Sequence, residues 1–230
     1  MKVLMVGFQR SGTTILKRML QNVPGVKHFF HELRVLKKHK TKEELAKWMK
    51  NKKGTDIDGV DWGEKVPFYG RKSKESIGYC KKWDNFFLPE SRIIHIVRHP
   101  VCIGISTIEF RPGKLKLNPT LDMYCQHIPE LVEYLDGLDH AIQIRYEDLM
   151  AEPLNMMKML CEFCELSTDF DHMCSEDDQG RFIFGNQTIV KGRAFRYTTY
   201  PRLQDVEVDV GPTIKKINKI VGGTPYTFER

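Results

Sequence analysis

The sequence lacks any apolar run long enough to cross a membrane. Its first residues, MKVLMVGF, are apolar but soon reach a glycine turn, which is too early for a signal sequence or a membrane span. The chain has no internal repeat and no low-complexity tract, and its composition, 41% hydrophobic and 29% charged, is typical of a folded globular protein. A length of 230 residues suits one compact core, so we expect a single domain over residues 1–230, with no membrane span.

The sequence also has little excess charge and few cysteines. A formal net charge of +6 fits an anionic ligand but is too small and scattered to indicate nucleic acid, which we do not expect as a partner. The densest basic run, 37–53, alternates with Glu43 and Glu44 and predicts a solvated helix face. The six cysteines have no secretory context, which predicts reduced thiols in a cytoplasmic protein. Cys161 and Cys164 have helical apolar spacing around them and are expected in the core rather than at a metal.

Short runs rich in β-branched residues alternate with helical patterns. The expected strands are 3–6, 92–97 and 141–146, and the expected helices are 13–21, 102–110, one announced by Pro153, and one from Pro212 to Gly222 or Gly223. This alternation predicts an α/β fold of the P-loop type, with three layers and a central, mostly parallel sheet flanked by helices. Ligands then bind at the carboxyl ends of the strands. Residues 41–89 are mixed and rich in glycine, and we expect them to add helices and loops over the site.

The segment 7–14, Gly-Phe-Gln-Arg-Ser-Gly-Thr-Thr, has the glycine spacing of a phosphate-binding loop between a strand and a helix. A nucleoside-triphosphatase places a lysine after the second glycine, where this chain has Thr13, and a cation stands instead at Arg10. Such a loop is poorly equipped for a β,γ-phosphate with Mg²⁺, whereas hydroxyls and an arginine suit a single phosphate that bears a sulfate. The alternative is an ordinary strand-to-helix turn containing glycine.

Two motifs resemble the sulfotransferases that use 3′-phosphoadenosine 5′-phosphosulfate (PAPS). Their phosphosulfate loop, [KR]-S-G-T-T, is matched by Arg10, Ser11, Gly12, Thr13 and Thr14. Their second signature, a strand-end arginine and a serine eight positions later, is matched by Arg98 and Ser106 in IIHIVRHPVCIGIS. The resemblance implies that this pair holds the 3′-phosphate, and an arginine and a hydroxyl can converge on one doubly charged group. Taken singly, Arg98 suits a surface ion pair and Ser106 an ordinary helix position.

Two weaker matches concern the nucleotide. RYEDLMAEP at 145–153 is similar to the family's Y-E-D-L-x-x-x-P segment, which implies that Tyr146 lies by the adenine, although a tyrosine at a strand end also suits the core. FGNQTIVKGRAFR resembles the loop that closes over the nucleotide and makes Asn186, Lys191 and Arg193 candidate phosphate ligands.

Within this family, the N-terminal half looks most like the tyrosylprotein sulfotransferase group. The stretch from Glu32 to Val35 corresponds to that group's E-T-R-V, which implies that Glu32 is the general base, with His31 and His28 as rivals. Lys65 begins a K-x-P-F motif, and the resemblance implies that it stabilises charge on the leaving group. A serine that this group has in its closing loop has no clear counterpart here.

The resemblance implies transfer of a sulfuryl group from PAPS to an acceptor hydroxyl by in-line displacement, without a metal. The catalytic residues are then expected to be Glu32, which receives the proton, and Arg10 and Lys65, which stabilise charge on the transferred group and the leaving phosphate. The acceptor stays open between a glycan, a small molecule and a peptide, and so does the oligomeric state. The alternatives are a small P-loop kinase and a non-catalytic module that binds nucleotides or polyanions.

Overall fold

The structure is a computed structural model. It describes residues 1–32, 34–54, 56–58, 60–68, 73–110, 112–113, 116–169, 174–176, 181–184, 187–190 and 206–227. For residues 174–176, 181–184 and 187–190 only the backbone is described.

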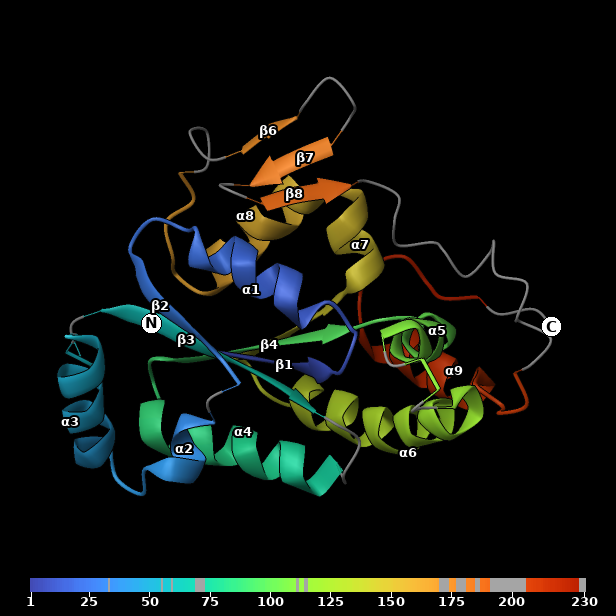
Figure 1. The fold of residues 1–230 in the computed structure, drawn as a ribbon, viewed down its shortest axis with the longest axis horizontal. Coiled ribbons are helices and arrows are strands. Elements are labelled where there is room, and N and C mark those ends of the chain that lie inside the picture. Colours follow the sequence, from blue (N-terminus) through green and yellow to red (C-terminus); the bar gives the residue numbers. More distant parts are fainter. Residues whose placement is uncertain are drawn as a thin grey trace.

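A five-stranded sheet forms the centre of the fold (Figure 1). Its strands are β1 (Lys2–Phe8), β2 (Val26–His31), β3 (Asp61–Phe68), β4 (Ser91–Val97) and β5 (Ala141–Arg145), in the order β2-β3-β1-β4-β5. All four pairings are parallel, which confirms the predicted sheet. The carboxyl ends of the strands therefore lie along one edge.

Helices cover both faces of this sheet, so the predicted three layers are confirmed (Figure 1). On one side lie α1 (Thr13–Gln21), α7 (Tyr146–Ala151) and α8 (Pro153–Phe163), and on the other lie α2 (Val35–Lys38), α4 (Ser73–Phe87) and α6 (Leu117–Asp136). The remaining elements are α3 (Lys42–Lys53), α5 (Pro100–Phe110), α9 (Gly211–Ile220) and a small antiparallel sheet of β6 (Cys174–Glu176), β7 (Arg181–Phe184) and β8 (Gln187–Val190). Within the described part of the chain, no helix is both long and apolar enough to span a membrane.

Burial on both faces explains why β1 is apolar from Val3 to Phe8. Val3 and Met5 pack in one cluster with residues of α1 and α8, whereas Leu4 and Val6 pack in a second cluster with residues of α3 and α4. Side chains of a strand alternate between faces, so a strand covered twice needs a continuous apolar run. Each such fully buried side chain contributes roughly 1.5–3 kcal/mol to folding.

The prediction for 41–89 was wrong for residues 61–68, which form the central strand β3 beside β1. The sequence DWGEKVPF has a proline and three charged residues, which argue against a central strand. Gly63 is required there because a Cβ atom would lie 2.6 Å from the Val3 carbonyl oxygen and 2.6 Å from the Phe29 ring. Glu64 and Lys65 are buried, and each has partners described below. Strand β2 was also not predicted.

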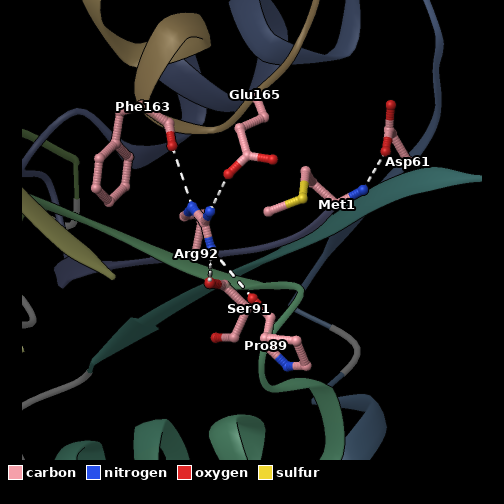
Figure 2. Close-up of polar contacts among 7 residues, drawn as sticks. All are labelled: Met1, Asp61, Pro89, Ser91, Arg92, Phe163 and Glu165. Carbon is pink, nitrogen blue, oxygen red and sulfur yellow. Dashed lines mark hydrogen bonds and ion pairs between the residues drawn. The ribbon is translucent and has the colours of Figure 1, made fainter. Parts of the chain in front are cut away.

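Polar contacts hold the amino-terminal ends of the strands, opposite the predicted binding edge (Figure 2). Arg92 of β4 donates to the carbonyl oxygens of Phe163, Ser91 and Pro89 and pairs with Glu165, so it ties the end of α8 to the sheet. The amino group of Met1 pairs with Asp61 at the start of β3. These contacts therefore stabilise the amino-terminal edge of the sheet.

The predicted helix starts are confirmed where proline marked them. Pro153 opens α8, and Pro212 lies in the first turn of α9. Helix α9 ends at Ile220, two residues before Gly222. The run 37–53 contains α3, whose lysines are exposed while Leu45 and Met49 are buried. Cys161 and Cys164 are fully buried free thiols in the core, as expected.

Candidate functional site

The phosphate-type loop joins β1 to α1 with two residues in the left-handed region, Arg10 (φ 67°) and Gly12 (φ 105°). A Cβ atom on Gly12 would lie 2.3 Å from Cδ2 of Tyr146, so the position needs glycine for its backbone angle and for space. The loop is held by the Ser11 amide, which donates to the carbonyl oxygen of Phe8 (3.1 Å). The first amides of α1 therefore open towards Tyr146 at the start of α7.

Two arginines and a serine from three elements meet beside this loop. Arg10 Nε donates to Ser106 Oγ of α5 (3.1 Å), and Arg98 Nη1, at the end of β4, donates to the Arg10 carbonyl oxygen (3.0 Å). The Arg98 guanidinium lies 4.3 Å from the centroid of the Tyr146 ring, and that of Arg10 lies 4.5 Å from the centroid of Phe110. Aromatic faces thus fix both guanidinium planes.

In the described part of the chain, no carboxylate forms an ion pair with either arginine of this cluster. Arg98 Nε is buried without a hydrogen-bond partner among the same residues. Burial, and next the charge of Arg98, lower the pKa of the Arg10 guanidinium. Two like charges held together in this way favour an anion between them.

A cavity of about 190 Å³ opens at this point. It is lined by Arg10, Gly12, Thr13, Thr14, Ile15, Arg98 and Tyr146. One wall is therefore the start of α1, another the two guanidinium groups, and a third the tyrosine ring. This combination suits a planar ring that carries phosphate.

A second polar cluster adjoins the loop from β3. Lys65 Nζ donates to Thr14 Oγ1 (2.9 Å) and pairs with Glu32 Oε1 (3.0 Å), although only 3% of the Lys65 side chain is exposed. Strand β3 lies next to β1, which brings the lysine against the first turn of α1. One cation thus connects the phosphate-type loop with the carboxylate after β2.

Glu32 lies in a turn after β2 rather than at a helix start. Its φ is 56°, and its amide donates to the Lys65 carbonyl oxygen (2.9 Å), which extends the pairing of β2 with β3. His31 Nε2 lies 3.3 Å from the Glu32 carboxylate, and burial followed by the charge of Lys65 lowers the pKa of His31. His28 lies away from the cluster, stacked on Phe30 near Lys53.

The structure brings most of the predicted residues together. Arg10, Gly12, Thr13, Thr14, Arg98 and Tyr146 line the cavity, Ser106 contacts Arg10, and Glu32 and Lys65 form the adjoining pair. Ser11 does not line the cavity, because its side chain is fully buried beneath Gly7. Asn186, Lys191 and Arg193 lie outside the described residues.

Sequence reasoning missed one residue, Phe110, which is 61% exposed and lies beside the Arg10 guanidinium. Its position four residues after Ser106 puts both on one face of α5 and was the available signal. Within the described residues, no group of three or more histidine, cysteine, aspartate or glutamate side chains could hold a metal ion.

A family model matches part of the chain and includes some of the site residues. Residues 60–171 match the model of the Sulfotransferase family, just under half of the chain. The matched range includes Lys65, Arg98, Ser106 and Tyr146 but not the loop 7–14 or Glu32. No curated protein matches the chain in sequence.

Several solved structures are similar to this chain in fold, and two of them match with TM-scores above 0.5. The sulfotransferase domain from the Synechococcus PCC 7002 olefin synthase has a TM-score of 0.64 and 18% identity, and the match covers 97% of this chain and 95% of that one. The sulfotransferase domain from the curacin biosynthetic pathway has a TM-score of 0.54 and 19% identity, over 72% of this chain and 74% of that one. The finer likeness to the tyrosylprotein group stays a prediction. The chain therefore has the fold of sulfotransferase domains, and residues 60–171 match the model of the Sulfotransferase family.

Proposed function

We propose that this chain transfers a sulfuryl group from PAPS to an acceptor hydroxyl. The observation that carries the proposal is the position of Lys65, which contacts Thr14 of the loop and Glu32 after β2. A simple anion-binding module needs the loop and the arginines, whereas a lysine shared with a carboxylate also provides groups for charge and proton transfer. The matched family model and the fold of the two similar domains support sulfuryl transfer in general.

The donor side fits a nucleotide with two anionic groups. Arg98, Arg10 and Ser106 would hold the 3′-phosphate, because Arg98 Nε is buried without a partner and the two guanidinium groups have no carboxylate between them within the described chain. Tyr146 offers a ring face for the adenine. The helix start at Thr13 and Thr14 would receive the 5′-phosphosulfate. Lys191 and Arg193 stay candidate ligands from the predicted closing loop.

The reaction follows from the second cluster. The acceptor oxygen attacks sulfur in line, the bond from sulfur to the bridging phosphate oxygen breaks, and the acceptor proton passes to the Glu32 carboxylate. Lys65 stabilises the negative charge that develops on the bridging oxygen, and adenosine 3′,5′-bisphosphate leaves. Lys65 Nζ contacts both Thr14 Oγ1 and Glu32 Oε1, so the lysine lies between the loop that would hold the donor and the carboxylate that would receive the proton.

The rival kinase function is disfavoured by the composition of the loop. Thr13 stands where a nucleoside-triphosphatase has its lysine, and Arg10 is turned to Ser106 and Phe110. A cytoplasmic location and the use of a glycan, small molecule or peptide as acceptor stay proposals that rest on the sequence.

Calorimetric titration tests the donor half of the proposal. We expect adenosine 3′,5′-bisphosphate to bind without metal, and ADP to bind much more weakly because it lacks the 3′-phosphate. Preference for Mg²⁺-ATP would contradict the proposal in favour of a kinase. Incubation with ³⁵S-labelled PAPS and a panel of hydroxyl acceptors tests transfer, and bisphosphate binding with no transfer to any acceptor would indicate a non-catalytic module.

A further inference from the structure

A buried carboxylate holds the turn that carries Glu32. Glu64 of β3 is completely buried, and its Oε2 accepts hydrogen bonds from the Val35 amide (3.1 Å) and from the Tyr79 hydroxyl of α4 (2.7 Å). Tyr79 also accepts from the Leu36 amide (3.4 Å). The first amides of α2 are thus anchored on one glutamate–tyrosine pair.

Glu64 and Lys65 hold the same turn from opposite faces of the sheet. Glu64 and Lys65 are consecutive, so their side chains leave opposite faces of the sheet. Lys65 holds the start of the turn through its backbone carbonyl oxygen and its pairing with Glu32, while Glu64 holds the end of the turn at Val35. Between these points Glu32 and Arg34 both have positive φ, 56° and 48°, a conformation that non-glycine residues keep only when their surroundings impose it.

The donor side is built in the same way. Glu147 of α7 is 3% exposed, and it accepts from the amide of His99 (3.1 Å) and from the hydroxyl of Tyr226 (2.7 Å). His99 follows Arg98 directly. Tyr226 belongs to the segment after α9, which Arg145 holds through the carbonyl oxygens of Gly222 and Val221.

Burial affects both carboxylates alike. Desolvation raises the pKa of Glu64 to about 7 and also raises the pKa of Glu147, while the tyrosine hydrogen bonds favour the ionised forms. Neither group lines the cavity. Direct ligand binding therefore does not explain why the chain buries these two carboxylates at a cost in free energy. A positioning role does explain it.

We propose that the two buried glutamate–tyrosine pairs separately position the two halves of the site. Glu64 with Tyr79 positions the Glu32 turn, and Glu147 with Tyr226 positions Arg98. All four residues are positioning residues, and their roles rest on the proposed function. Tyr226 makes the segment after α9 part of the donor site although it does not contact the cavity.

The test compares three variants, each of which removes one hydroxyl group: Tyr79→Phe, Tyr226→Phe and, as a control, Tyr134→Phe. Tyr134 is half-buried on α6 and belongs to neither pair. In Tyr79→Phe, kcat with PAPS should fall about tenfold while the Kd for adenosine 3′,5′-bisphosphate stays within about twofold. In Tyr226→Phe, that Kd should rise about tenfold, and the control should match the wild-type protein. Thermal melting shows that each variant is folded.

Hydrogen exchange gives a readout that does not depend on activity. Exchange should accelerate around Val35 and Leu36 in Tyr79→Phe, and around His99 in Tyr226→Phe, each without change at the other site. A wild-type protein that neither binds the bisphosphate nor transfers sulfate would refute the proposed function, but the exchange pattern would still test the positioning. Exchange that rises at both sites in both variants, or at neither, would overturn the inference.

Discussion

Replacing Arg98 with alanine should weaken binding of adenosine 3′,5′-bisphosphate by about two orders of magnitude. Arg98 reaches the cavity with its guanidinium over the Tyr146 ring (4.3 Å) and one nitrogen on the Arg10 carbonyl oxygen (3.0 Å), while Nε is buried without a partner in the described chain. Charge-assisted hydrogen bonds contribute about 1.5–3 kcal/mol each, and truncating one partner of a buried charged contact costs about 2–5 kcal/mol. A loss near 3 kcal/mol corresponds to about a hundredfold change in Kd.

Calorimetry with the bisphosphate measures this loss directly, and thermal melting checks that the variant is folded. Arg98→Lys should give an intermediate Kd, because lysine keeps the charge but loses the planar fork that stacks on Tyr146. Arg18→Ala serves as a control, since Arg18 is exposed on α1 and does not line the cavity. A folded Arg98→Ala protein whose Kd lies within threefold of the wild-type value would refute the assignment of this arginine to the 3′-phosphate.

Three further predictions concern other parts of the chain. Lys65→Met should lower kcat about 10²- to 10³-fold and change the bisphosphate Kd much less, because it removes charge stabilisation in the transition state. Steady-state kinetics measure kcat and calorimetry measures Kd. An equal loss in kcat and in binding would contradict this prediction. Gly12→Ala should lower the free energy of unfolding by about 2 kcal/mol or more, measured in urea, because its Cβ atom would lie 2.3 Å from Tyr146 at φ 105°. Burial lowers the pKa of His95 to about 4 in the folded protein. Between pH 6.5 and 4 the unfolded chain therefore binds more protons at this residue than the folded chain does, so His95 lowers the free energy of unfolding as the pH falls. Relative to the wild-type protein, His95→Gln should therefore gain about 2 kcal/mol of unfolding free energy between pH 7 and pH 5, and a constant difference would show that His95 does not titrate in this way.

The sequence predicted those parts of the fold in which strand, turn and helix follow one another directly. This held for β1 with α1 and for β4 with α5, where apolar runs end at glycine or at a proline-containing turn. It failed for β3, because the identity of that strand depends on tertiary partners. Glu64 and Lys65 can be buried in its centre only because Tyr79, Val35, Thr14 and Glu32 come from distant elements to meet them.

The same limit applied to the site. The resemblance to the sulfotransferase signature indicated Arg98 and Ser106, but not that Ser106 accepts a hydrogen bond from Arg10. That contact joins residues 96 positions apart, and Arg10 makes it from a backbone conformation with positive φ that the motif does not reveal. A motif can name ligands, whereas the angle at which a loop presents them is set by packing, here by Phe110 beneath the guanidinium.

The loop lacks a lysine of its own, but Lys65 of β3 brings a lysine to it from a neighbouring strand. A lysine within the loop would concentrate positive charge on one phosphate chain, as in a nucleoside-triphosphatase. Here the cations are divided, because Arg10 and Arg98 meet on one side of the cavity while Lys65 reaches Thr14 from β3. A ligand that satisfies both groups must carry two separate anionic groups, and one end must lie beside Glu32, which shares Lys65. The proposed donor, an adenosine 3′-phosphate with a transferable 5′-phosphosulfate, would meet this requirement, whereas the single polyphosphate chain of ATP would leave either the arginine pair or Lys65 without an anionic partner.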